Sequence, residues 1–153
     1  MRLLRSTHHQ ADIGLTILRV IAGLIFAVHG GQKLFVYGFD GVTGAFTQMG
    51  APLPGITGPL VALTEFFGGF ALALGLLTRV AGLGLSVVMI GALVLVHLAN
   101  GFFLPNGYEF VLMLLGAAVT LTVTGAGRYS VDALVANRDE RAVSVPEAVR
   151  RAA

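Results

Sequence analysis

Four long apolar segments dominate this sequence, at residues 13–28, 59–77, 80–96 and 110–126. At a rise of about 1.5 Å per residue, each can approach the roughly 30 Å of membrane hydrocarbon if its polar flanks continue as helix. The chain is 56% hydrophobic and 12% charged, with a mean hydropathy of +0.84. Because so few charges could not cover such a core in water, the pattern predicts an all-α, multi-pass membrane protein.

Most arginines fall on one predicted side of the membrane. They lie near the N-terminus, in the second connection and in the C-terminal region: Arg2, Arg5, Arg79, Arg128, Arg138, Arg141, Arg150 and Arg151. Basic residues favour the cytoplasmic side. We expect a four-helix transmembrane bundle over residues 1–128, with spans at about 13–33, 59–77, 80–100 and 108–126. Both termini are then cytoplasmic, and residues 129–153 form a cytoplasmic tail.

The first connection, residues 34–58, is too long for a tight hairpin and too apolar to lie free in water. It is rich in glycine and proline and also carries large apolar side chains: Phe35, Tyr37, Phe39, Phe46, Met49 and Leu53. Aromatic residues favour the headgroup level of a bilayer. We expect a compact re-entrant or interfacial lid.

Seven polar residues share the outer end of the predicted bundle, because helices one and three leave the membrane there and helices two and four enter it. They are His29, Gln32, Lys33, Glu65, His97, Asn100 and Glu109. Glu65 lies deepest among the acids. A carboxylate in hydrocarbon faces the bundle interior, pairs with a cation or is protonated. Lys33 and the two histidines are its available partners.

This outer cluster has two interpretations. In the first it is a site for a quinone or another small ligand, and Glu65, His29 and Lys33 transfer protons or contact that ligand. The other members would complete the binding surface: Gln32, His97, Asn100 and Glu109. In the second interpretation, the pairs Lys33–Glu65 and His97–Glu109 fix the helix register and do no chemistry.

Neither cysteine nor a di-iron motif is present. The absence of cysteine excludes thiolate metal sites and disulfides, and the Glu-x-x-His spacing of di-iron bundles is missing. We therefore predict no metal site. Haem ligation by His29 and His97 is a less favoured alternative, because it needs facing helices with a porphyrin-sized gap.

The two halves of the chain align at an offset of 68 residues, the separation of His29 and His97. The other aligned pairs are Val28 with Val96, Gln32 with Asn100, and Phe35 with Phe103. A Glu-Phe pair then opens each following span, at residues 65–66 and 109–110. The pattern is that of a 2+2 internal repeat, a device common in membrane folds; a chance match is the alternative.

Small residues recur four positions apart within the spans, at Gly23/Ala27, Gly69/Ala73 and Ala71/Gly75. This spacing lets helices approach closely. It predicts packing rather than chemistry.

Three arginines are expected to be structural or interfacial. Arg19 lies inside the first span on nearly the same helix face as Asp12, so we expect it to pair or to extend toward the interface. Arg79 and Arg128 lie at helix ends, where lipid phosphates or carbonyls are available.

Several short motifs in this order resemble the DoxX family over residues 12–135. They are Leu18-Arg19-Val20, Gly23, Phe26, His29-Gly30-x-x-Lys33-Leu34, Glu65 with Gly69 and Gly75, Thr78-Arg79, Gly107-x-Glu109, and Gly125-x-Gly127-Arg128-x-Ser130-x-Asp132. The resemblance implies a four-helix inner-membrane protein. The positions that match the family are Arg19, His29, Lys33, Glu65 and Glu109.

The resemblance also implies functions. Family members include a subunit of a thiosulfate:quinone oxidoreductase and a component of a membrane complex that links superoxide dismutase with a sulfurtransferase in oxidative and thiol-stress defence. We therefore expect a quinone-linked or redox-associated subunit, with other membrane or peripheral redox proteins, or a second copy, as partners. Any thiol chemistry belongs to a partner, and no nucleic-acid partner is expected. A non-enzymatic scaffold and a small-ligand-binding or transport protein are the alternatives.

Overall fold

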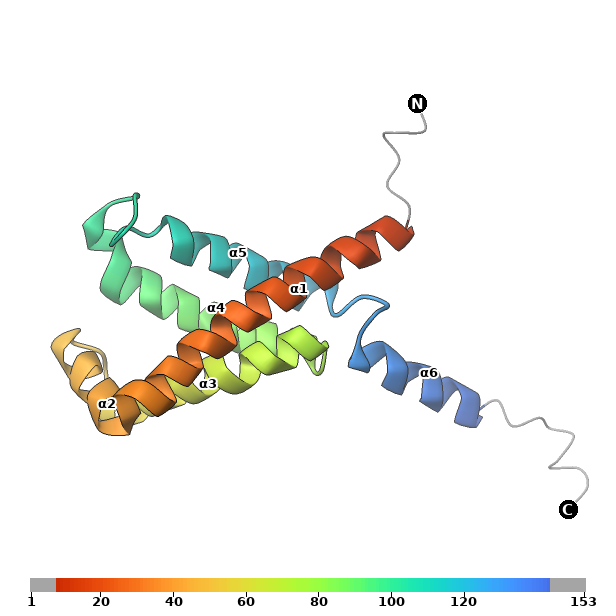
Figure 1. Cartoon of the computed structure of the whole chain (residues 1–153), viewed down its shortest axis with the longest axis horizontal. Helices are drawn as coiled ribbons and strands as arrows, with labels where there is room; N and C mark the ends of the chain where they lie inside the picture. The colour runs from red at the N-terminus through yellow and green to blue at the C-terminus, as the bar shows by residue number, and fades with distance from the viewer. Residues whose placement is uncertain (1–7, 144–153) are drawn as a thin grey trace, which may run out of the picture.

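The computed structural model describes residues 8–143, and every regular element in that range is helical. The bundle consists of α1 (His8–Gly31), α3 (Pro54–Leu74), α4 (Thr78–Ala92) and α5 (Glu109–Thr124) (Figure 1). Helix α6 (Val131–Val143) follows in the tail. The predicted all-α, four-helix bundle is confirmed.

The helices have the lengths and composition of membrane spans. Three stretches are long and apolar enough to cross a bilayer: His8–Gln48, Pro54–Leu74 and Thr78–Asn100. The fourth, α5, is apolar and has 16 residues. At about 1.5 Å per residue it covers most of the hydrocarbon thickness.

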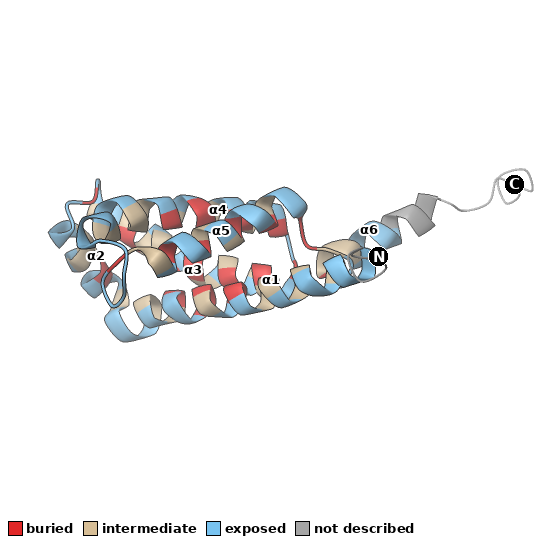
Figure 2. Cartoon of the chain, turned by 90° about the horizontal axis from the view of Figure 1, so that it is seen from above, coloured by how far each residue is buried: buried red, intermediate tan, exposed pale blue. Residues whose placement is uncertain are grey.

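A small set of fully buried side chains forms the core of the bundle. Phe26, Leu72, Leu85 and Leu121 are among the largest of them. Apolar residues on the outside are exposed instead, as Figure 2 shows along each helix; Ile17, Ile21 and Val28 line one such outer face of α1. In a membrane this outer surface contacts lipid.

Helix α1 packs most extensively on α3, and α4 packs on α5, whereas α1 and α5 touch lightly. Glycines allow the first pairing, because a Cβ on Gly23 would lie 2.6 Å from both the Ala73 nitrogen and the Gly69 carbonyl oxygen. The Gly23/Ala27 and Gly69/Ala73 spacings therefore lie in a close helix contact, as predicted. Gly75 ends α3 with a φ of 69°, and its Cβ position is taken by the Arg19 guanidinium of α1 rather than by backbone.

The first connection, for which we expected a compact re-entrant or interfacial lid, is mostly helical. A π-helical segment, η2 (Gln32–Tyr37), continues α1 directly, and α2 (Gly38–Gln48) follows after a change of direction at Gly38, whose φ is 66°. Helical winding satisfies backbone groups at membrane depth, which a loop cannot do. Helix α2 packs back on α3, where buried Val42 contacts Gly58. Phe35, Tyr37 and Phe39 remain exposed, as the headgroup level favours.

The second span is shifted from its expected position. Helix α3 begins at Pro54 rather than at Pro59, because Pro54 takes the first-turn position that proline favours and Pro59 is accommodated inside the helix. The third span matches the expected 80–100 closely: α4 continues through a π-helical segment, η3 (Leu93–His97), and a 3-10 turn, η4 (Leu98–Asn100).

The start of α1 and the segment that follows α5 meet at one end of the bundle. The Tyr129 hydroxyl lies 3.0 Å from Nδ1 of His9, and the backbone nitrogen of Arg128 donates to Asp12 Oδ1 at 3.2 Å. We call this the terminal end (Figure 1). The opposite end, with η2, α2 and the α4–α5 connection, is the loop end. By the same arginine distribution as above, the terminal end is predicted to face the cytoplasm.

Replacing Gly69 by leucine is expected to destabilise the bundle by about 1–3 kcal/mol, because the side chain would overlap the backbone of α1. Thermal unfolding of the purified protein in detergent, followed by circular dichroism, measures the change. Gly116→Leu is the matched control, since a Cβ at Gly116 meets open space. Equal losses in both variants would show that the glycine contact is not the cause.

Candidate functional site

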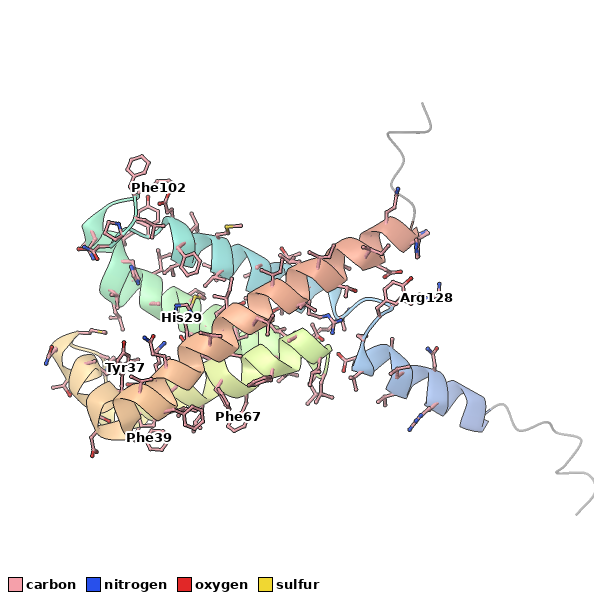
Figure 3. All side chains as sticks on the ribbon, in the orientation of Figure 1. His29, Tyr37, Phe39, Phe67, Phe102 and Arg128 are labelled. Atoms are coloured by element: carbon pink, nitrogen blue, oxygen red, sulfur yellow. The ribbon has the colours of Figure 1, made fainter. Side chains whose placement is uncertain are left out.

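The sequence cluster divides into two groups at the loop end. Lys33, at the start of η2, and Glu65 of α3 come together. Three others belong to the α4–α5 connection: His97, Asn100 and Glu109. An aromatic contact links the two groups, since the ring centroids of His29 and Phe110 lie 6.2 Å apart. Figure 3 shows His29 on the side of α1 that faces α5.

Lys33 donates from Nζ to Oε2 of Glu65 and forms an ion pair. The Glu65 side chain is 5% exposed and that of Lys33 is 23% exposed. Gly30 brings the two helices together here, because its Cβ position is taken by the Phe66 backbone. A carboxylate this deeply buried is strongly unfavourable without a cation. The pair therefore compensates a charge that α3 places inside the bundle.

Aromatic rings pack beside this ion pair. Phe66 follows Glu65 in α3 and makes edge-on contacts with Phe35 at 5.4 Å and with Phe70 at 5.1 Å between ring centroids. The ion pair itself is largely removed from solvent, since the Glu65 side chain is almost fully buried. The low-dielectric surroundings strengthen its electrostatic attraction.

A shallow groove of about 510 Å³ runs along the end of α1 and along η2. Its lining residues are Val28, His29, Gly31, Gln32, Phe35 and Val36. Nδ1 of His29 lies 2.9 Å from the Ile25 carbonyl oxygen. A carbonyl only accepts, so Nδ1 carries the hydrogen and Nε2 of the neutral ring is left as an acceptor. The exposed Gln32 side chain adds an amide that can both donate and accept.

The residues of the α4–α5 connection are bound to nearby backbone. Nδ1 of His97 donates to the Asn106 carbonyl oxygen at 2.9 Å, and Glu109 accepts the Leu104 N–H at 2.8 Å. The Asn100 amide donates to the Val96 carbonyl oxygen one turn earlier, at 2.7 Å. These bonds fix the connection. Among the side chains that the structure describes, His97 and Glu109 do not form the ion pair considered above.

Both histidines thus use Nδ1 for a backbone bond, and Nε2 is the nitrogen left for a ligand. Within the described part of the chain, no three His, Asp or Glu side chains gather as metal ligands. The haem alternative needs His29 and His97 on facing helices. In the structure the ring of His29 contacts Phe110 of α5, whereas His97 bonds to the backbone of the α4–α5 connection. Among the described residues, the loop end therefore offers a buried ion pair and a groove lined by His29.

The terminal end contains a polar network whose central acid, Asp132, was not among our candidates. Asp132 Oδ1 accepts the Leu77 N–H at 2.7 Å, Oδ2 accepts the Thr78 N–H at 3.0 Å, and its own N–H donates to the Gly75 carbonyl oxygen at 2.8 Å. The tail thereby caps the N-terminus of α4. The motif that ends in Ser130-x-Asp132 contained this residue, but spacing alone gave it no partner.

Arg19 joins the same network from α1. It is 2% exposed, and Nη2 donates to the Tyr129 carbonyl oxygen at 2.6 Å, while Asp132 provides a nearby negative charge. This differs from the expected snorkelling or Asp12-paired arginine, because the closing tail covers Arg19 and Asp12 bonds the Arg128 backbone instead. Arg79 and the side chain of Arg128 are exposed at this end.

A helical bundle of apolar spans with buried charges defines a multi-pass membrane protein. Residues 14–98 match the model of the DoxX family, and this chain belongs to that family. It is a multi-pass protein of the cell (inner) membrane.

Relatives support the same assignment over most of the chain. The chain is 35% identical to "Putative oxidoreductase CatD" of Bacillus subtilis over 81% of its own length and 88% of that protein. It is 33% identical to "Inner membrane protein YqjF" of Escherichia coli, over 81% and 93% of the two chains. It is 32% identical to "Uncharacterized membrane protein Rv3486" of Mycobacterium tuberculosis, over 88% of each. No solved structure gave a significant match.

Lys33→Met is expected to destabilise the protein by about 3–5 kcal/mol, because it leaves the Glu65 carboxylate buried without a cation. The double variant Lys33→Met/Glu65→Leu should recover most of this loss. Thermal unfolding of the wild type, Lys33→Met, Glu65→Leu and the double variant forms a double-mutant cycle. Additive effects in that cycle would contradict a buried, coupled pair.

Asp132→Asn is expected to lower stability by about 1–2 kcal/mol, because it removes a charged cap from the start of α4 and a counter-charge from Arg19. Asp40→Asn, at the exposed start of α2, is the control with the same chemical change. Chemical unfolding in detergent compares the two. A control loss as large as that of Asp132→Asn would rule out the cap as the source.

Proposed function

We propose that this chain is a redox-associated subunit of a membrane oxidoreductase complex and that it holds a quinone headgroup in the groove beside His29. The observation that carries the proposal is a groove lined by His29 and Gln32 on the same stretch of helix that carries Lys33, the cation of the buried ion pair with Glu65. The name of the relative CatD, a putative oxidoreductase, points in the same direction.

The residues of the groove fit such a ligand. Val28, Phe35 and Val36 supply apolar walls, and His29 and Gln32 supply two polar side chains at one end of a membrane helix. A volume of about 510 Å³ lies within the usual range for small-molecule sites. The groove opens on the outside of α1, so a lipid-soluble molecule reaches it from within the bilayer.

The side chains suggest how protons would move. A bound quinone supplies two-electron, two-proton redox chemistry. Nε2 of His29 is an acceptor in the neutral ring, so it can take a proton from a quinol hydroxyl. The Gln32 amide can donate a hydrogen bond to a quinone oxygen and orient it. The Lys33–Glu65 pair, one helical turn beyond His29, supplies fixed charges close to that position.

In the same proposal, the remaining members of the cluster form an outer rim of the quinone site: His97, Asn100 and Glu109. Their backbone bonds fix the α4–α5 connection, and Phe110, directly after Glu109, contacts the ring of His29. Because the chain has no cysteine, thiol groups and further electron carriers come from partner proteins. A second copy of the chain is one such partner.

A non-enzymatic scaffold is the second candidate. The observation that favours it is the capped tail, in which Asp132 fixes α6 to the bundle and presents it at the terminal end. In that case the Lys33–Glu65 pair serves helix register alone. Deleting residues 129–153 should then abolish co-purification of partners, whereas changes at the loop end should not.

Quinone binding to the purified full chain tests the first proposal. Titration with a short-chain quinone analogue, followed by calorimetry, should give saturable binding. His29→Ala and Glu65→Gln should each weaken it by about tenfold, which corresponds to the loss of roughly one buried hydrogen bond or charge contact. Gln32→Leu should weaken it less.

His8→Ala is the matched control for His29→Ala, because His8 is exposed at the opposite end of α1. Thermal unfolding of every variant identifies any that have lost their fold. Binding that is unchanged in both His29→Ala and Glu65→Gln, with the fold intact, would refute the quinone site.

A further inference from the structure

We propose that a hollow at the terminal end binds a phosphate group. It has a volume of about 430 Å³ and lies where α4 begins, α5 ends and α6 begins. Its polar lining residues are Thr78, Arg79, Thr124, Ser130 and Asp132. This site is remote from the loop end and does not depend on the proposed quinone function.

Arg79 is positioned at the hollow without a partner of its own. A Cβ on Gly125 would lie 3.3 Å from Nε of Arg79, so the side chain extends across the glycine that ends α5. Gly125 has a φ of 82°, which suits a residue without a side chain. Among the side chains that the structure describes, none forms a hydrogen bond or ion pair with the Arg79 guanidinium. An unpaired guanidinium offers the fork of donors that a phosphate accepts.

Thr78 provides an independent observation. It is fully buried and is one of the residues that line the hollow, and its hydroxyl has no hydrogen-bond partner among the described residues. The hydroxyls of Thr122 and Thr124 instead donate to carbonyls one turn earlier. Thr78 begins α4, so no carbonyl of its own helix precedes it. A buried hydroxyl without a partner is unfavourable, and a ligand oxygen would satisfy it.

Asp132 is the one carboxylate in the hollow, and its charge is already engaged. Both oxygens accept N–H groups from the start of α4, and Arg19 lies near it on the other side. These contacts reduce its repulsion of an incoming anion. Because Asp132 occupies the helix N-terminus, the phosphate is held by side chains, chiefly the Arg79 guanidinium and the Thr78 hydroxyl.

The position of the hollow suggests two sources for the phosphate. The terminal end is where α4 enters and α5 leaves the apolar part of the bundle, so it lies at the level of lipid headgroups. A phosphodiester of a membrane lipid therefore reaches it directly. Free phosphate in the surrounding water shares the same chemistry.

Native mass spectrometry of the detergent-solubilised full chain tests the site. Titration with phosphatidylglycerol should give one saturable bound lipid. Arg79→Gln should reduce its affinity by about tenfold, the loss expected for one charge-assisted contact. The lipid affinity of Arg79→Lys should lie between those of the wild type and Arg79→Gln, because lysine keeps the positive charge but lacks the forked donors of the guanidinium. Thr78→Val should weaken binding without changing any charge.

Arg138→Gln is the matched control, since Arg138 is exposed on α6 and does not line the hollow. A parallel titration adds inorganic phosphate to the lipid-bound protein. If millimolar phosphate displaces the lipid, the site exists and free phosphate is its ligand. If the lipid resists displacement, the site exists and a lipid headgroup is its ligand. Equal losses in Arg79→Gln and Arg138→Gln, or no saturable binding in the wild type, would overturn the proposal. Thermal unfolding confirms that each variant is folded.

Discussion

The contact between the backbones of α1 and α3 determines much of the rest of the structure. Within lipid, apolar side chains gain little by leaving one apolar environment for another, so close backbone packing becomes a main source of helix association. Gly23 and Gly69 permit that packing, and Gly30 extends it to Phe66. This alignment places Glu65 against α1, where Lys33 is within reach. The same contact therefore supports both the stability of the bundle and the geometry of its buried charge.

The two ends of the bundle handle polar groups in different ways. At the loop end, one ion pair is buried between two helices, and the other polar residues bond to adjacent backbone. At the terminal end, Asp132 and Arg19 connect α1, the start of α4 and the tail. The loop end consequently combines an accessible histidine with a buried charge pair, a combination that suits a ligand site. The terminal end unites segments that are distant in the sequence.

Features that depend on local pattern could be predicted from the sequence. The apolar segments indicated the bundle, the small-residue spacing indicated the α1–α3 contact, and the isolation of Glu65 indicated Lys33 as a partner. The helical first connection could not be predicted, because its glycines and prolines are typical of loops and only the membrane environment favours winding them. The hydrogen bond from His97 to the Asn106 carbonyl also could not be predicted from the sequence, since any backbone carbonyl can accept such a bond. Asp132 finds its partners 54 and 55 residues away, which spacing rules do not reveal.

That long separation has a consequence for synthesis of the protein. Helix α4 enters the membrane early, yet the carboxylate that completes its first turn belongs to a segment translated after α5. Until Asp132 has left the ribosome, the first N–H groups of α4 must be satisfied by water or lipid headgroups. The buried Arg19 likewise lacks its bond to the Tyr129 carbonyl. The bundle is therefore closed at its terminal end by a segment translated after all four of its helices, so that both groups are in place only once residues 129–132 have been made.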